Sequence, residues 1–255
     1  MTQQTIVTAA ILAIGDELLS GRTKDKNIGH LAELLTLSGI DLKEVRIVAD
    51  EEDAIVAALN ALREKYDYVF TSGGIGPTHD DITADAVSKA FGVPCIHETE
   101  AMKLLAAMYE RRGMEFTQAR QRMARMPEGA THIPNPVSTA PGFTIGNVYV
   151  MAGVPQVFQA MVDAVLPTLR GGARVMSRSV TSPYGEGDIG GPLGEVQKRH
   201  PETSIGSYPK FDGKFFSTEL VIRARDETLL SAAEADVIAM IESIKSEKVK
   251  ADPAA

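Results

Sequence analysis

Five carboxylates stand directly after predicted strands, and they are the side chains of this sequence best suited to chemistry. Asp16 and Glu17 follow the first apolar run, and Asp50 follows the second. Asp80 and Asp81 follow the third. Because the carboxyl ends of parallel strands lie on one edge of a sheet, we expect these acids to share one rim. Hard oxygen ligands of this kind suit a Mg²⁺ or Mn²⁺ ion that bridges a pyrophosphate.

A glycine-rich stretch connects the third apolar run to the last two acids. Residues 71–81 read Thr-Ser-Gly-Gly-Ile-Gly-Pro-Thr-His-Asp-Asp. Three glycines and a proline in five positions predict a tight turn whose backbone approaches a ligand closely. A strand, such a turn and a helix N-terminus together favour a phosphorylated ligand. Further along, Asn135 and Thr139 stand in a proline-rich loop and either orient a ligand or shape a turn.

The glycine stretch lacks the signatures of several other kinds of site. No Gly-Lys-Ser/Thr follows the glycines, which excludes a Walker A loop. His79 stands where a dinucleotide fingerprint needs its third glycine. Ser72 lacks the Gly-x-Ser-x-Gly surround of a nucleophile elbow. The five histidines form no His-x-x-x-His pair, which argues against a zinc hydrolase.

Each acid also has a purely structural interpretation. Asp50 could cap the helix that follows it, and Asp80 or Asp81 could cap the next one. Asp16 could shape the turn after the first strand, and Glu17 could be a solvated loop acid. The glycines are harder to explain as a turn alone, because a turn does not require so many of them.

The elements that would position these residues alternate between strand and helix. Apolar runs predict buried strands over residues 6–14, 42–49 and 66–71. Helical patterns are predicted over residues 27–38, 50–62, 83–91, 98–112, 117–125 and 153–169. A hairpin around Gly146-Asn147 adds antiparallel strands. We therefore expect an α/β fold of three layers, in which a parallel (mixed) sheet carries helices on both faces.

A second domain is expected after Arg170-Gly171-Gly172, so that the domains span residues 1–170 and 173–248. Its pattern is strand, helix, two strands and helix, which predicts a small α+β domain. These elements are predicted over residues 174–181, 192–199, 203–207, 215–224 and 228–246. The tail, residues 248–255, is expected to be disordered.

Composition limits the partners and the compartment. The 255 residues are 44% hydrophobic and 24% charged, as in soluble globular proteins. No run approaches the ~18 apolar residues of a membrane span, and the N-terminus lacks a cationic leader, so a cytoplasmic protein without a membrane partner is expected. The net charge of -8 disfavours a nucleic-acid partner. The single cysteine, Cys95, excludes an internal disulfide.

Three motifs in the first domain resemble those of MoaB/Mog-type molybdopterin-binding domains, and most closely the N-terminal region of the competence/damage-inducible protein A (CinA) family. They are Gly15-Asp16-Glu17-Leu18-Leu19-x-Gly21, Ser72-Gly73-Gly74-x-Gly76-Pro77-Thr78-x-Asp80-Asp81 and Asn135-Pro136-Val137-x-Thr139-Ala140-Pro141-Gly142. The resemblance covers roughly residues 5 to 170. In the second domain, Gly187-Asp188-Ile189 and Gly206-Ser207-Tyr208-Pro209 resemble the following region of that family and part of eukaryotic FAD synthases.

The resemblance implies two activities. Molybdenum-cofactor relatives bind molybdopterin at this rim, where acids that match Asp50 and Asp81 are implicated. The CinA branch and the FAD synthase part are associated with metal-dependent hydrolysis of the pyrophosphate in ADP-ribose or FAD. The Asp16-Glu17 pair matches that branch better. Relatives form dimers or trimers, so the resemblance also implies a homo-oligomer.

One departure from the family pattern affects the site. The family often has Pro-Gly-x-Pro-x-Glu before the last helix of the first domain. This sequence has Ala152-Gly153-Val154-Pro155-Gln156-Val157, without the first proline and the glutamate. The departure removes a carboxylate at Val157.

The leading expectation is a metal-dependent nucleotide pyrophosphatase that acts on a phosphorylated small molecule such as ADP-ribose or FAD. Asp50, Asp81 and Asp80 would be catalytic, and Asp16, Asp50 and Asp81 would hold Mg²⁺, Mn²⁺ or Co²⁺. The residues expected to bind the substrate and its phosphates are Gly15, Ser72, Gly73, Gly74, Gly76, Pro77, Thr78, Asn135 and Thr139. The alternative is a protein that binds molybdopterin without hydrolysis. A third interpretation, an oligomeric scaffold with a decayed site, rests on the missing glutamate alone.

Overall fold

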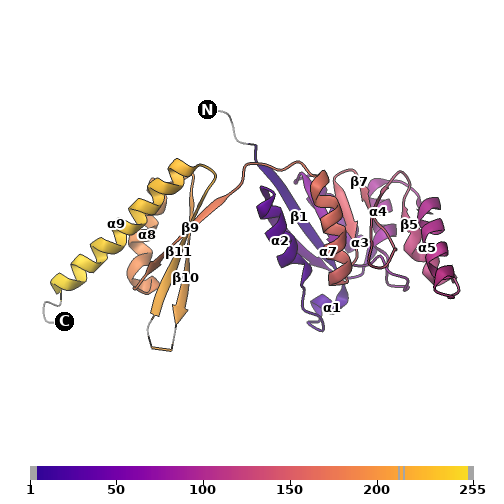
Figure 1. The fold of residues 1–255 in the computed structure, drawn as a ribbon, viewed down its shortest axis with the longest axis horizontal. Helices are drawn as coiled ribbons and strands as arrows, with labels where there is room; N and C mark the ends of the chain where they lie inside the picture. Colours follow the sequence, from indigo (N-terminus) through magenta and orange to yellow (C-terminus); the bar gives the residue numbers. More distant parts are fainter. Residues whose placement is uncertain (1–4, 212, 215, 252–255) are drawn as a thin grey trace. The chain divides into compact units, whose positions relative to one another are not determined.

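The computed structural model describes residues 5–211, 213–214 and 216–251, and the chain forms two compact units, residues 1–173 and 174–255 (Figure 1). The first unit contains a six-stranded sheet in the order β2-β1-β3-β8-β7-β6. Its strands are β1 (Val7–Ile14), β2 (Ile40–Val48), β3 (Tyr68–Ser72), β6 (Thr131–Ile133), β7 (Gly142–Ile145) and β8 (Val148–Met151). The pairs from β2 to β8 are parallel, whereas β7 pairs antiparallel with both β8 and β6. The predicted α/β fold with a mixed sheet is confirmed.

Helices cover both faces of this sheet, and the inner strand β1 is apolar on both sides. Ala10, Leu12 and Ile14 of β1 belong to a core shared with α3 (Glu52–Arg63), α4 (Thr83–Phe91) and α5 (Thr99–Arg111). Residues 7, 9 and 11 of the same strand face the opposite core, with α2 (Asn27–Leu37) and α7 (Pro155–Val165). The strand alternates between the two cores as its period of two requires.

Some local predictions were wrong between residues 117 and 142. The predicted helix over residues 117–125 is divided into α6 (Gln118–Gln121), the 3₁₀ turn η1 (Arg122–Ala124) and the start of β5 (Arg125–Pro127). β5 pairs antiparallel with β4 (Cys95–His97) in a separate two-stranded sheet. Pro127 disfavours helical geometry at Met126, which is consistent with the extended backbone of β5. No strand was predicted over residues 131–133, where the structure has β6.

Two other segments also differ from prediction. The expected loop after β1 contains a short helix, α1 (Asp16–Leu19). The last helix of the unit ends at Val165, and a 3₁₀ turn, η2 (Leu166–Thr168), follows it. No helix in the described part of the chain is long and apolar enough to cross a membrane.

The second unit is a three-stranded antiparallel sheet in the order β10-β11-β9 with two helices. Its elements are β9 (Met176–Ser182), α8 (Glu186–Arg199), β10 (Ser204–Phe211), β11 (Phe216–Ala224) and α9 (Glu227–Ala251). α8 begins before the predicted start at Pro192, which lies inside the helix. Because α9 continues to Ala251, the predicted disorder is wrong for residues 248–251, and residues 252–255 lie outside the described part. Buried residues such as Ile189, Leu220 and Val237 join both helices to the sheet.

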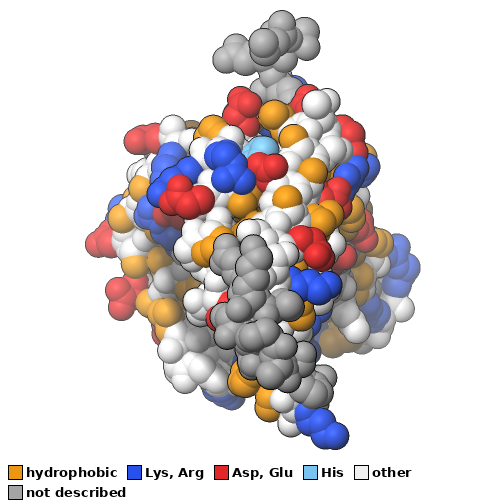
Figure 2. Space-filling view, turned by 90° about the vertical axis from the view of Figure 1, so that its left-hand side faces the viewer, with side chains coloured by type: hydrophobic (Ala, Val, Ile, Leu, Met, Phe, Trp, Pro, Cys, Tyr) orange, Lys and Arg blue, Asp and Glu red, His pale blue; other side chains and the backbone are white. Residues whose placement is uncertain are grey.

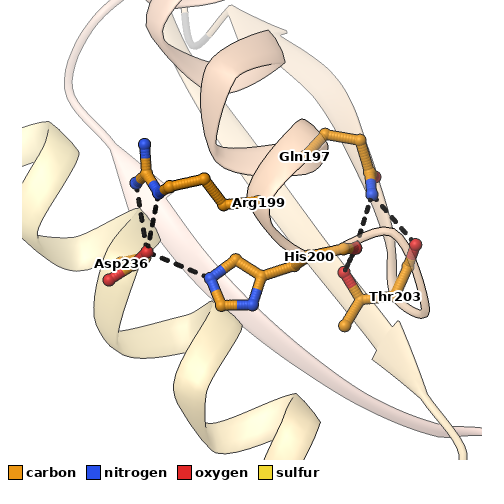
Figure 3. Close-up of polar contacts among 5 residues, drawn as sticks. All are labelled: Gln197, Arg199, His200, Thr203 and Asp236. Carbon is orange, nitrogen blue, oxygen red and sulfur yellow. Dashed lines mark hydrogen bonds and ion pairs between the residues drawn. The ribbon is translucent and has the colours of Figure 1, made fainter.

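A polar cluster joins the end of α8 to α9 (Figure 3). Oδ2 of Asp236 accepts hydrogen bonds from Nε and Nη2 of Arg199, at 3.2 and 3.0 Å, and lies 3.0 Å from Nε2 of His200. Gln197 closes the following loop, because its Nε2 donates to the carbonyl oxygens of His200 and Thr203, each at 3.0 Å. This cluster secures the α8–α9 packing. On the face shown in Figure 2, acidic and basic side chains are interspersed rather than segregated.

Candidate functional site

The glycine turn after β3 has a backbone that other residues cannot adopt without strain. Gly73 and Gly74 have φ angles of 112° and 69°. A Cβ atom on Gly73 would lie 2.2 Å from the carbonyl oxygen of Ile14, and one on Gly74 would lie 2.1 Å from Oγ1 of Thr83. The amide of Thr83 donates to the carbonyl of Gly74 at 3.0 Å, which ties the turn to the start of α4. Glycine is therefore required at both positions.

Three successive amides of this turn are free to bind an anion. The amide of Gly73 donates to the carbonyl of Met151. The amides of Gly74, Ile75 and Gly76 donate to no partner in the described part of the chain. Consecutive unpaired amides in a turn with positive φ angles form an anion-binding concavity.

The end of the turn is closed around Asp81. Its Oδ2 accepts hydrogen bonds from the amide and the hydroxyl of Thr78, at 2.8 and 2.5 Å. Arg122 holds the same segment from η1, because its Nε donates to the carbonyl of Thr78 at 3.1 Å and its Nη2 to the carbonyl of Asp81 at 3.0 Å. α4 has Ile82 at its N-cap without a side-chain cap bond, so the interpretation of Asp80 or Asp81 as a helix cap is wrong.

Asp16 and Asp50 are linked across the ends of β1 and β2. The amide of Asp16 donates to Oδ2 of Asp50 at 2.9 Å, and the amide of Asp50 donates to Oδ1 of Asp16 at 3.4 Å. The N-cap of α3 is Glu51, so Asp50 is not the cap of that helix. The carboxylate of Asp50 therefore bonds to the residue that follows β1 and does not cap α3.

The two acids Asp50 and Asp80 have pKa values displaced in opposite directions. Burial raises the pKa of Asp50 above its ordinary value, and the charges of Asp16, Glu17 and Asp80 raise it further, against a lowering by the Asp16 amide. The pKa of Asp80 is lowered, chiefly by the nearby hydroxyl of Thr78, although in the structure this hydroxyl donates to Asp81. Pairs of carboxylates with divergent pKa values are typical of sites that carry out acid–base work.

These features open onto one cleft of about 520 Å³. Of the residues predicted to bind the substrate or act on it, those that line the cleft are Gly15, Asp50, Gly73, Gly74, Gly76, Pro77, Asp80, Asp81 and Asn135. Asp16, Ser72, Thr78 and Thr139 were also predicted for the site, but they do not line this cleft. Asp16 and Thr78 instead hydrogen-bond to the acids that do.

Part of the cleft is apolar, which the sequence did not indicate. Ile75, Met123, Val154 and Val157 line it together. Val157 occupies the position at which the resembled family often has a glutamate, so the departure lies within the cleft wall. Unpaired backbone amides and an apolar wall within one cleft suit a ligand that carries both an anionic group and an apolar ring.

Asn135 is a loop-shaping residue. Its Oδ1 accepts from the amides of Val137 and Ser138, and its Nδ2 donates to Oγ of Ser138 and the carbonyl of Ala140. Thr139 has the one positive φ angle, 71°, of a non-glycine residue in the described segments. These bonds favour a role for Asn135 in shaping the loop over a role in orienting a ligand.

Two residues that sequence reasoning assigned otherwise, or not at all, support the site. A helix was predicted from Asn27 onward, but no sequence pattern indicated that Nδ2 of Asn27 donates to Oγ of Ser72 and to the carbonyl of Gly153, both at 2.8 Å. Arg122 has no local pattern that marks it. Both act over long sequence separations, which no motif could have revealed.

The donor set partly fits a divalent metal. No group of three His, Cys, Asp or Glu side chains within the described residues converges closely enough to hold an ion. Burial, however, and then the like charges of its neighbours raise the pKa of Asp50, and a cation would relieve the repulsion between these charges. Mg²⁺ is usually bound by one or two carboxylates and by substrate phosphates rather than by a cage of protein ligands. The residues therefore fit an ion that arrives with a phosphorylated ligand.

The fold and the cleft define an α/β domain of the molybdopterin-binding type. The family described as "Probable molybdopterin binding domain" matches residues 10–171, and "FAD synthase, middle domain" matches residues 174–250. The chain belongs to the family of proteins with this probable molybdopterin-binding domain, and it is similar to CinA-like proteins.

Three comparisons illustrate this similarity. The structure of the protein CinA from Thermoplasma acidophilum, described as of unknown function, has a TM-score of 0.59 and 31% identity, and the match covers 64% of this chain and 98% of that one. A protein from Pyrobaculum arsenaticum is 40% identical over 211 residues, which are 79% of this chain and 80% of the relative. A CinA-like protein from Citrifermentans bemidjiense is 39% identical over 167 residues, which are 64% of this chain and 40% of that relative.

Proposed function

We propose that this protein is a metal-dependent nucleotide pyrophosphatase that acts on a dinucleotide-type diphosphate such as ADP-ribose or FAD. One observation carries the proposal: residues 74–76, whose amides are unpaired, line the same cleft as Asp50, Asp80 and Asp81. Hydrolysis of a diphosphate needs hydrogen-bond donors for the phosphate oxygens and, at the same place, groups that stabilise the charge that develops. The match of the second unit to the middle domain of FAD synthase also favours a nucleotide ligand.

In this proposal the amides of residues 74–76 bind the diphosphate oxygens. The apolar part of the cleft, with Ile75, Met123 and Val154, contacts the flat ring of the nucleotide. Asp81 is held by Thr78, so its second carboxylate oxygen is free to act on the ligand side. The turn therefore positions the phosphates and an acid with a single backbone segment.

Hydrolysis would cleave the bond between one phosphorus and the bridging oxygen. Water forms the new bond to that phosphorus, and Asp50, whose pKa is raised, accepts the proton that the water loses. The bridging oxygen leaves as part of the second phosphate monoester. A bound Mg²⁺, Mn²⁺ or Co²⁺ would supply charge neutralisation at the phosphates. Asp50 and Asp81, with Asp16 adjacent, are the residues that would hold it.

The experiment is a hydrolysis panel with purified protein, ADP-ribose and FAD, and each of the three metals. We expect AMP release that requires the metal. The Asp81→Asn variant should turn over at least ~10-fold more slowly, as expected for loss of a well-placed catalytic group. Asp163→Asn is the matched control, because Asp163 is exposed on α7 and distant along that helix from the residues that line the cleft. No AMP release from a folded sample under any condition would sink the proposal.

The second candidate is a molybdopterin-binding protein without hydrolase activity. Val157 favours it, because an apolar side chain lines the cleft where the resembled family often has a glutamate. Binding of molybdopterin with no hydrolysis of either nucleotide would support this alternative. Tight nucleotide binding with turnover would exclude it.

We further propose that the protein acts in the cytoplasm as a homo-oligomer, a dimer or a trimer, as the resemblance implies. Light scattering of the eluting peak in size-exclusion chromatography measures the mass directly. A mass of 27.3 kDa, that of one chain, would contradict the oligomer.

A further inference from the structure

A second, smaller cavity of about 60 Å³ adjoins the cleft. The two cavities share the lining residues Ile14, Glu17, Thr23, Gly153 and Pro155. The side pocket is completed by the segment before α2 and by the first residue of that helix, Asn27. A ligand in the cleft can therefore extend one small group into the side pocket.

Asn27 lines this pocket, and its side chain has an unsatisfied hydrogen-bond acceptor. The residue is 3% exposed, and its Oδ1 has no hydrogen-bond partner. The orientation of its amide is determined by its neighbours, because reversal would place Oδ1 against the carbonyl oxygen of Gly153, 2.8 Å away. A buried acceptor without a donor is rare in proteins, so the site requires a group that donates.

The backbone around Asn27 is fixed independently of its side chain. Oδ1 of Asp25 accepts from the amides of Asn27 and Ile28, at 3.1 and 2.8 Å. These bonds satisfy the start of α2. The side chain of Asn27 is therefore not needed as a helix cap. Its side-chain amide instead donates to Ser72, the last residue of β3, and to Gly153, which follows β8.

The lining groups define which donor fits. Glu17 places a second acceptor, a carboxylate, at the boundary between the pocket and the cleft. The charged residues of the lining do not select an ion, because the acids Glu17 and Asp25 are matched by Lys24 and Lys26, and this balance favours neither a phosphate nor a metal cation. Two neutral hydroxyls satisfy both acceptors. The volume of about 60 Å³ exceeds the ~10–15 Å³ that one water-sized group needs, so the pocket has room for a pair of hydroxyls.

We propose that the side pocket binds the vicinal hydroxyls of a ligand sugar, with Oδ1 of Asn27 and the carboxylate of Glu17 as the two acceptors. The inference rests on the proposed function and narrows it to ligands that contain a ribose or ribityl diol. The cleft then selects nucleotides by their sugar, and a ligand without a diol leaves Asn27 unpaired.

The test is equilibrium binding by calorimetry of three ligands in the presence of Mg²⁺. They are ADP-ribose, its analogue without the 2′ and 3′ hydroxyls of the adenosine sugar, and its analogue without the diol of the terminal sugar. We expect the analogue that lacks the diol bound in the side pocket to bind at least ~10-fold more weakly than ADP-ribose, because its hydrogen bonds to a charged acceptor are lost. The ratio of the two dissociation constants measures this loss. In Glu17→Ala this ratio should fall toward one, whereas Glu33→Ala, an exposed acid on α2, should preserve it.

Each other outcome is decisive. Equal affinity for all three ligands overturns the sugar subsite and leaves the proposed function intact. An unchanged ratio in Glu17→Ala overturns the assignment of the acceptor pair. Failure of every ligand to bind a protein that still unfolds cooperatively on heating overturns the proposed function, and this inference with it.

Discussion

Asp16 and Asp50 exchange hydrogen bonds between their amides and carboxylates across the ends of two parallel strands. The Asp16 amide donates to Oδ2 of Asp50 at 2.9 Å, and the reverse bond measures 3.4 Å. Parallel pairing places Ile14 opposite Val48, so each acid follows its strand on the same edge. The pair holds two like charges close together, which is unfavourable for folding and suited to the binding of a cation.

Replacement of the Asp50 carboxylate by an amide should raise the stability of the protein while it lowers its activity. A raised pKa means that Asp50 favours folding below its ordinary pKa and that this contribution is lost as the pH rises through the folded value. The side chain of the Asp50→Asn variant is neutral at every pH and avoids that loss, so we expect an unfolding midpoint at pH 7 that is higher by about 1–3 °C. Calorimetry measures the midpoint.

The same variant should lower metal-dependent turnover at least ~10-fold. In wild type, turnover should fall on the acid side as Asp50 becomes protonated, because Asp50 must be ionised to hold the metal and to accept a proton. Asp163→Asn serves as the control for both measurements. A variant with unchanged turnover and lower stability would contradict the role of Asp50.

Gly74→Ala should destabilise the protein more than Gly21→Ala does. Both glycines have positive φ angles, 69° and 71°, so the backbone strain is matched. Only at Gly74 would the new Cβ meet a neighbour, Oγ1 of Thr83 at 2.1 Å. We expect an additional cost of at least ~1 kcal/mol from this clash. Urea unfolding of the two variants measures the difference, and equal midpoints would show that the turn relaxes freely.

Arg122→Ala should weaken metal activation, because Arg122 positions Thr78 and Asp81 through their carbonyls. We expect the Mg²⁺ concentration for half-maximal activity to rise about 10-fold, as for loss of charge-assisted hydrogen bonds. Arg122→Lys should restore part of it. Arg112→Ala, an exposed arginine at the end of α5, is the control. A fall in stability without any change in metal dependence would reduce Arg122 to a structural role.

Glu44 should contribute to stability in a defined pH range. Its carboxylate accepts hydrogen bonds from Tyr66, Arg46 and Lys65, which lower its pKa from 4.5 to about 2. A lowered pKa gives stability that is present above 4.5 and is lost as the pH falls through about 2.

The comparison of wild type with Glu44→Gln tests this pH dependence. The difference in unfolding midpoint should be largest at about pH 5 to 7, where the carboxylate is ionised in both the folded and the unfolded chain, and should vanish near the folded pKa. Thermal unfolding followed by circular dichroism measures both proteins. A difference that does not depend on pH would contradict the linkage.

Local features of the fold were predictable. The strands β1, β2 and β3 and the helices α2 to α5 have strong periodic patterns with clear ends, and they appear within a few residues of their predicted positions. The short strands β5 and β6 were missed because three residues give no period. They form only because partners supply the missing hydrogen bonds, as β4 does for β5.

The amino-acid order alone was enough to place Asp16, Asp50 and Asp81 after strands on one edge, with a glycine-rich turn among them. These features are local: the alternation of a strand and the positive φ angles of Gly73 and Gly74 are set by the residue types at those positions and beside them. They can therefore be predicted without knowledge of the packing.

The folded packing settled which of the predicted residues line the cleft and what completes it. Arg122 reaches the turn from a segment 44 positions away from Thr78, and Asn27 reaches Gly153 across 126 positions. Such contacts depend on how the layers pack, and packing is set by the sum of many distant side chains rather than by any motif.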